Sequence, residues 1–198
     1  MSTRIDIKSK SAVGAKLMQS GQTTSFVTND DGDLQAGREV SFYRLASNNP
    51  FGNDNRFTDQ FGGQAFSTNK IVVDWSTYDG STVLGYAYSL VASANWPTAV
   101  ANCAALTWGG YNTGWRMANI KELINIWDNA GVFTNKFATP FPFASADIWS
   151  STTCINNSLN AIYMPNSATI AVFTLAKVGN SRTSVAVRTF TVSGTTLS

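Results

Sequence analysis

The sequence Gly-Trp-Arg-Met-Ala-Asn-Ile-Lys-Glu-Leu at residues 114–123 is a turn that leads directly into a capped helix. Asn119 can accept a hydrogen bond from a free amide of the first turn, and Glu122 can reach back to the backbone of the cap. This is a capping box with asparagine in place of serine or threonine. Apolar residues then recur at helical spacing before a glycine stop: Ile120, Leu123, Ile124, Trp127 and Gly131. The pattern predicts a helix over residues 120–129.

Other short motifs surround this helix in the sequence: Trp96-Pro97-Thr98-Ala99-Val100, Cys103, Gly109-Gly110-Tyr111, Trp149-Ser150-Ser151-Thr152 and Val187-Arg188. Together with residues 114–123 they resemble the signatures of the Lcl C-terminal family (DUF1566), over about the last two thirds of the chain. Two positions depart from the family pattern, because Ala118 replaces its usual proline and Met117 its usual leucine. The resemblance implies a C-type-lectin-like fold and these signature residues: Trp115, Arg116, Asn119, Glu122, Leu123, Trp149, Ser150 and Arg188.

The order of predicted elements indicates an α+β fold in which two helices accompany antiparallel strands. Asp79-Gly80 is a hairpin turn signal between two strand patterns, and Pro97 suits the first position of a helix. The expected strands are 71–75, 82–90, 160–164, 170–177 and 184–192, and the expected helices are 97–106 and 120–129. We therefore expect a C-type-lectin-like domain over residues 66–198, preceded by a loop-rich β region over residues 1–65.

The predicted N-terminal region contains a strand pattern at residues 38–45 and then an irregular segment at residues 46–66. This segment carries four phenylalanines: Phe51, Phe57, Phe61 and Phe66. So many aromatic side chains in an irregular segment are expected to pack, either on the same domain or on a neighbouring subunit. Residues 1–65 are therefore predicted to attach or oligomerise the protein, and a homotrimer is the expected assembly.

The composition narrows the class of protein. Charged residues make up only 13% of the 198 residues, and the net charge is +2. This balance gives no electrostatic reason to expect nucleic acid or an anionic membrane as a partner. No run of eighteen apolar residues predicts a transmembrane helix, and the first residues show no apolar signal-peptide core. A polar, exported-looking surface without an export signal is typical of phage structural proteins, which are released by lysis.

Catalytic and metal-binding patterns are absent from the sequence. The chain has no histidine, which excludes histidine-dependent triads and histidine-ligated zinc. It has no P-loop, no Gly-x-Ser-x-Gly and no dinucleotide-binding glycine pattern. The acidic turn at Asp30, Asp31 and Asp33 lacks a glutamate at EF-hand spacing, because the next one is Glu39. We expect a non-enzymatic protein with no cofactor and no metal.

Cys103 and Cys154 are the two cysteines of the chain, and both lie near the family signatures. One interpretation is a disulfide that ties the first helix to the segment after Trp149, as lectin-like domains often have. The other is a pair of separate buried thiols that behave as small apolar residues.

The candidate ligand-binding residues are Trp108, Tyr111, Asn156 and Asn157. Trp108 stands beside Gly109-Gly110 and is the tryptophan expected to be most exposed, whereas Asn156 and Asn157 lie in a predicted loop. Analogy with the fold places the recognition surface in residues 132–147 and 155–160.

The expected function is that of a phage virion protein: a decoration, head-fibre or tail-associated subunit. Residues 1–65 would contact other virion proteins, and the outward lectin-like domain would adhere to a glycan or protein on the host surface. The alternative is a glycan-binding adhesin module that is secreted or held on a bacterial surface. Membrane insertion and nucleic-acid binding are not expected.

Overall fold

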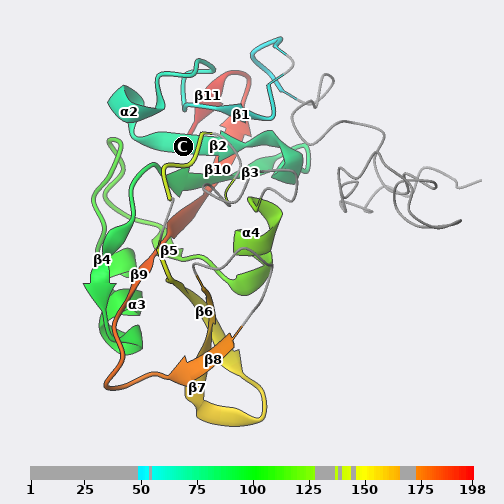
Figure 1. Ribbon diagram of the computed structural model, residues 1–198. Coiled ribbons are helices and arrows are strands. Elements are labelled where there is room, and N and C mark those ends of the chain that lie inside the picture. Colours follow the sequence, from blue (N-terminus) through cyan, green and yellow to red (C-terminus); the bar gives the residue numbers. More distant parts are fainter. Residues whose placement is uncertain (1–48, 54, 128–136, 138–139, 144–145, 166–172) are drawn as a thin grey trace, which may run out of the picture.

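A computed structural model describes residues 49–53, 55–127, 137, 140–143, 146–165 and 173–198. The described fold is α+β and mostly β, which agrees with the predicted class (Figure 1). Its elements are β1 (Phe57–Thr58), α2 (Phe66–Asn69), β2 (Ile71–Asp74), η1 (Trp75–Thr77), β3 (Thr82–Ala87), β4 (Val91–Ala94), α3 (Trp96–Ala104), β5 (Trp115–Met117), α4 (Ile120–Asn125), β6 (Ile148–Cys154), β7 (Asn157–Met164), β8 (Phe173–Ala176), β9 (Arg182–Ser184), β10 (Ala186–Ser193) and β11 (Thr196–Leu197). The predicted strand at residues 38–45 and the acidic turn at residues 30–33 lie outside the described residues.

The first sheet has the strand order β1-β2-β3-β10-β11, and β5 also pairs with β10. Strands β2 and β3 form the predicted hairpin, and all pairs in this sheet are antiparallel. In the turn, Asp79 accepts hydrogen bonds from the backbone amides of Thr82 and Ser81, which hold the pKa of its carboxyl well below the ordinary value. Strand β10 comes near the end of the chain but pairs with β3, which comes early. This pairing brings the two ends of the described chain into one sheet.

The second sheet has the order β4-β9-β6-β7-β8. Figure 1 shows it below the first sheet, with the β6–β7 hairpin at the bottom of the view. The strands of the domain were expected to be antiparallel, but β6 and β9 run parallel, with Ile148 opposite Thr183. The parallel pair is possible because the chain leaves β6 through β7 and β8 before it returns as β9.

Two apolar clusters lie on opposite faces of the first sheet. Side chains alternate between them along each strand, because successive residues of a strand point to opposite faces. Val72, Tyr86 and Val187 enter the first cluster, which also contains Leu123 and Ile126 of the α4 region. The second cluster takes the intervening residues of the strands and includes four large buried aromatic side chains: Trp75, Trp115, Trp149 and Phe190. The first sheet is therefore buried on both faces over much of its length.

The helix starts follow the predictions closely. Asn95 caps α3 by accepting a hydrogen bond from the Thr98 amide, and Pro97 lies in the first turn. α4 begins at Ile120 with the predicted capping box. It ends at Asn125 instead of 129, and the buried side chain of Arg56 donates a hydrogen bond to the Asn125 carbonyl, one of the acceptors that a helix end leaves free. A side chain from a distant part of the chain therefore satisfies the end of this helix.

Residues 49–65 pack on the rest of the described chain. Arg56 is buried against Asp74, and Phe57 belongs to the first cluster. The Trp75 indole donates a hydrogen bond to the hydroxyl of Thr58. The boundary expected at residue 65 therefore falls inside one packed unit, and residues 1–48 lie outside the described residues. Of the four phenylalanines, Phe57 and Phe66 are buried, Phe51 packs edge-on against Trp75 and Phe61 is 70% exposed.

Both cysteines are free thiols, so the disulfide considered between Cys103 and Cys154 is not formed. Cys103 is buried in α3, with its sulfur 3.3 Å from the hydroxyl of Ser184. Burial raises the pKa of this thiol. Cys154 is half-buried at the end of β6. The structure therefore matches the interpretation of two separate thiols, with α3 held to β9 by packing.

Candidate functional site

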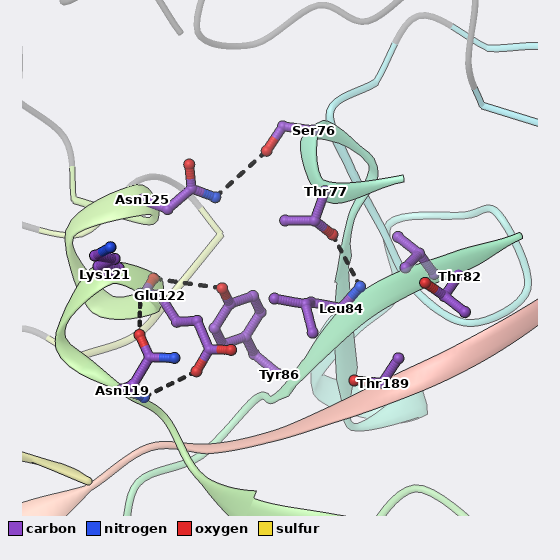
Figure 2. Close-up of a pocket in the computed structure, with 11 residues that line it drawn as sticks. Ser76, Thr77, Thr82, Leu84, Tyr86, Asn119, Lys121, Glu122, Asn125 and Thr189 are labelled. Carbon is purple, nitrogen blue, oxygen red and sulfur yellow. Dashed lines mark hydrogen bonds between the residues drawn. The ribbon is translucent and has the colours of Figure 1, made fainter. Parts of the chain in front are cut away.

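A hollow lies between α4 and the first sheet (Figure 2). Its volume is about 440 Å³, and pockets of about 300–1,000 Å³ are typical of small-molecule sites. It is lined by residues of η1, β3, β10 and the α4 region: Ser76, Thr77, Thr82, Val83, Leu84, Tyr86, Asn119, Lys121, Glu122, Asn125 and Thr189. Most of these side chains carry a hydroxyl or amide group, but the surface that they present to the hollow is mostly apolar.

The sheet side of the hollow follows from strand periodicity. Thr82, Leu84 and Tyr86 share one face of β3, because side chains two residues apart point the same way. Thr189 of β10 pairs directly with Leu84 and therefore lies on that face beside it. Tyr86 is fully buried under α4, whereas Leu84 is half-buried and Thr189 is exposed. Helix α4 therefore covers the sheet at Tyr86 and leaves it uncovered at Leu84 and Thr189, where the hollow lies.

The helix side of the hollow is formed by the capping box. The Asn119 side-chain oxygen accepts a hydrogen bond of 3.0 Å from the Glu122 amide, and the Asn119 amide donates one of 2.8 Å to the Glu122 carboxylate. The Thr152 hydroxyl accepts a hydrogen bond from the Ile120 amide, another free amide of the first turn. These bonds hold the start of α4 rigidly against β6.

Glu122 is also held by Arg116, which the family resemblance named as a signature residue. The guanidinium donates to both carboxylate oxygens, at 2.8 and 2.5 Å, and this pairing raises the pKa of Arg116. The Tyr86 hydroxyl donates to the backbone oxygen of Glu122 at 3.3 Å. Burial raises the pKa of Tyr86 well above its ordinary value, so the phenol stays protonated. The ionisable groups here are engaged in holding α4 in place.

A buried ion pair lies behind the other end of α4. Arg56 binds Asp74 through two hydrogen bonds of 2.8 Å, and both side chains are almost completely buried. Arg56 also donates to the Asn125 backbone oxygen at 2.7 Å. The Asn125 side-chain nitrogen donates to Asp74 at 2.8 Å and lies 3.4 Å from the Ser76 hydroxyl oxygen. This network fixes the side chain of Asn125 at the edge of the hollow.

The predicted ligand-binding residues Trp108 and Tyr111 lie elsewhere. Each is half-buried, and the two form an isolated β-bridge. The Trp108 indole donates to the Lys70 backbone oxygen, and the Tyr111 hydroxyl donates to the Leu197 backbone oxygen. These bonds tie their loop to Lys70, just before β2, and to Leu197 of β11, so both side chains have a structural role here. Trp108 and Trp96 are the two tryptophans that are not buried.

Asn156 lies in the turn between β6 and β7, Asn157 is the first residue of β7, and both are exposed. The Asn157 side chain accepts a hydrogen bond from the Leu159 amide at 3.0 Å, which shapes the turn. Neither residue lines the hollow, and the structure does not bring them together with Trp108 and Tyr111. Within the predicted recognition segments, only residues 137, 140–143, 146–147 and 155–160 are described.

The remaining signature residues support the fold. The Trp149 indole donates to Ala94, the Ser150 hydroxyl donates to Ile162 and the Trp115 indole donates to Tyr111, each to a backbone oxygen. Leu123 is completely buried. Arg188 donates to the Thr113 backbone oxygen, and its guanidinium lies over the rings of Tyr111 and Phe190 at 4.5 Å.

The hydroxyl residues of the hollow were missed by sequence reasoning. Ser76, Thr77, Thr82 and Thr189 belong to no motif, and they come together only through the pairing of β3 with β10 and the turn after β2. The one signal in the sequence was the capping box, since Asn119 and Glu122 contribute to the hollow.

No protein-family model matches the chain, and no curated protein or solved structure matches it either. Among the described residues, no group of three or more cysteine, aspartate or glutamate side chains is placed to hold a metal ion. None of the described helices is long and apolar enough to cross a membrane.

Proposed function

We propose that this chain is a phage virion protein whose C-type-lectin-like domain adheres to the host surface. The proposal has three parts: the lectin-like nature of the domain, its use in recognition and its place on a particle. Each part has its own support.

The lectin-like part is supported by how the signature segments meet. The Ala118 amide donates to the Val185 backbone oxygen, and the Ser151 amide donates to the Ala118 backbone oxygen. The segment before α4 therefore joins the start of β10 to the Trp-Ser-Ser-Thr segment of β6. Two helices, α3 and α4, follow an early hairpin and precede the closing strands, which is the order of elements that the family resemblance implies. The closing strand β10 also pairs with β3 of that hairpin.

The observation that carries the recognition part is the hollow itself. It offers amide and hydroxyl groups on a rigid frame, and the capping box and the buried ion pair set their positions. Pre-positioned polar groups around an apolar patch favour reversible binding, because little conformational entropy is lost when a ligand is held. Glu122 is already held by Arg116 and Asn119, and the protonated Tyr86 donates to the protein backbone. We therefore favour adhesion over catalysis.

The virion part rests on the charge-poor composition and on the N-terminal region. In the proposal, residues 1–48 provide most of the attachment to other virion proteins. The homotrimer remains our proposed assembly, and the exposed Phe61 is a side chain that a subunit contact would cover.

Two measurements on the full chain test this function. Fluorescently labelled protein is expected to bind intact cells of a strain that the phage infects and to leave non-host cells unlabelled. Gold-labelled antibodies are expected to decorate purified particles from the lysate. Failure to bind any cells would overturn the adhesive role. Labelling of the bacterial surface in place of particles would overturn the virion role and favour the alternative, a bacterial glycan-binding adhesin.

A further inference from the structure

We propose that the hollow between α4 and the first sheet binds one saccharide unit of a surface glycan through Asn119, Asn125 and Thr189. This inference rests on the adhesive function proposed above and names the ligand class and the contacts. It places the binding site away from Trp108, Tyr111, Asn156 and Asn157, the positions that sequence reasoning selected.

Asn119 presents a fixed hydrogen-bond donor. Its side-chain oxygen faces the Glu122 amide, which can only donate, so the identity of the two amide atoms is set by the cap. The side-chain nitrogen is left with no hydrogen bond to the described part of the chain. Figure 2 shows this nitrogen on the side of Asn119 that faces Tyr86 and the hollow.

Asn125 presents a fixed acceptor by the opposite arrangement. Its side-chain nitrogen faces Asp74, and a carboxylate can only accept, so the nitrogen must be the atom that points there. The side-chain oxygen is left with no hydrogen bond to the described residues, and Figure 2 shows it turned away from Ser76 at the rim. A donor at the start of α4 thus faces the hollow, and an acceptor lies at the rim beside the end of α4.

The sheet opposite supplies a hydroxyl beside an apolar surface. Thr189 is exposed, and its hydroxyl makes no hydrogen bond to any described residue, so it is free to donate and to accept. Leu84 lies directly opposite it across the β3–β10 pair. Thr77 and Thr82 use their hydroxyls within the protein, on Asp74 and Asp79, and present their methyl groups as further apolar surface.

This set of groups matches a saccharide better than an anion or a nucleotide. Each sugar hydroxyl both donates and accepts, so it can use an amide nitrogen, an amide oxygen and a threonine hydroxyl. The C–H face of a pyranose can cover Leu84. Among the described residues that line the hollow, Lys121 is the only cationic side chain, and the Glu122 carboxylate is already paired with Arg116. A phosphate group would find no cluster of positive charge there.

Single substitutions can remove one contact and preserve the fold. Asn119→Asp keeps the side-chain oxygen that caps α4, since aspartate and asparagine are equivalent caps, but replaces the outward donor with an acceptor. Thr189→Val removes the hydroxyl and keeps the shape of the side chain. Thr191→Val is the matched control, because Thr191 is also exposed and lies on the same face of β10 but does not line the hollow.

The test screens a panel of methyl pyranosides against the full chain by saturation-transfer NMR and titrates the best binder by calorimetry. Asn119→Asp and Thr189→Val are each expected to weaken binding about fivefold or more, as loss of one hydrogen bond does. Thr191→Val is expected to bind like the wild type, and thermal unfolding confirms that each variant is folded.

Three results would overturn the inference. One is a wild-type chain that binds host cells but none of the pyranosides, which leaves the adhesive function standing with a different ligand. The second is pyranoside binding that Asn119→Asp and Thr189→Val do not change, which places the sugar elsewhere. The third is equal weakening by Thr191→Val, which removes the link to the hollow. Loss of cell binding by the wild type itself would instead count against the proposed function.

Discussion

Arg56 and Asp74 form a two-bond ion pair, each bond 2.8 Å long, with both side chains almost completely buried. Arg56 lies in a segment that we expected to belong to a separate N-terminal region, and Asp74 ends β2. Their network extends to Asn125 at the end of α4. The pair therefore joins the N-terminal segment, the first sheet and one wall of the hollow.

Breaking this pair from one side should destabilise the protein strongly. Asp74→Ala leaves the Arg56 charge buried without its partner, which costs about 3–5 kcal/mol in comparable sites. Urea unfolding followed by tryptophan fluorescence measures the loss. The double variant Arg56→Met with Asp74→Leu is the control, because it leaves no buried charge and should retain more stability than Asp74→Ala. A single variant as stable as the wild type would contradict this assignment.

The capping box gives a smaller and more local effect. Asn119→Ala removes the acceptor for the Glu122 amide and should lower the free energy of unfolding by about 1 kcal/mol. Asn119→Asp should be close to neutral, since it retains the acceptor. Thermal unfolding of the two variants beside the wild type distinguishes them. Equal losses for both would show that the side-chain oxygen is not what stabilises α4.

Truncation should show where the folded unit begins. Removal of residues 1–48 leaves Arg56 and Phe57 in place and should give a cooperatively unfolding protein. Removal of residues 1–65 deletes both and should give a protein that unfolds at markedly lower temperature or not cooperatively. Light scattering on the full chain and on the 49–198 fragment also tests the assembly. A trimeric full chain with a monomeric fragment would assign oligomerisation to residues 1–48. A fragment that stays trimeric would assign it to the described domain.

Asp59 should contribute to acid sensitivity. Burial raises the pKa of its carboxyl, but hydrogen bonds from the Asn69 side chain and the amides of Phe61, Gly63 and Ala65 outweigh burial and lower it below the ordinary 3.8. A group with a lowered pKa in the folded state stabilises the protein above its unfolded pKa, and this stabilisation is lost as the pH falls through the folded value. The contribution of Asp59 should therefore be complete near neutral pH and begin to fall as the pH drops towards 4.

The Asp59→Asn variant tests this contribution. It should be less stable at pH 7, because the amide cannot accept from so many donors, and its stability should change less between pH 6 and 3 than that of the wild type. Urea unfolding across this range provides the measurement. An unchanged acid dependence would contradict the role assigned to Asp59.

The two thiols should react at different rates. Iodoacetamide at pH 8 should modify Cys154 before Cys103, because Cys103 is buried and its pKa is raised. In denaturant without a reducing agent, mass spectrometry should find both cysteines alkylated. Recovery of a bonded pair under those conditions would show that a disulfide forms after all.

Several features of the fold were predictable because they depend on residues close together in the chain. The capping box of Asn119 and Glu122 and the Asp79 hairpin turn were confirmed. The predicted length of α4 was wrong: the helix ends at Asn125, whose carbonyl is bound by Arg56, 69 residues earlier in the chain. The antiparallel expectation was wrong for β6 and β9, since no local pattern states which strand a distant segment will join.

The candidate site was even less predictable, because most of its residues are far apart in the chain. Asn119 and Glu122 were singled out by local spacing, yet Thr189 and Leu84 carry no mark in the sequence and meet only because β10 pairs with β3. Trp108 looked exposed beside its glycines, but the Lys70 backbone engages its indole.

Local hydrogen bonding and side-chain periodicity act over a few residues, so the chain alone was sufficient to specify its helix starts, its hairpin and its mostly β class. The hollow, the buried Arg56–Asp74 pair and the free thiols depended on which distant segments come into contact. Which distant segments pair is determined by the packing of the whole core on both faces of the first sheet, so these contacts are known only from the tertiary structure.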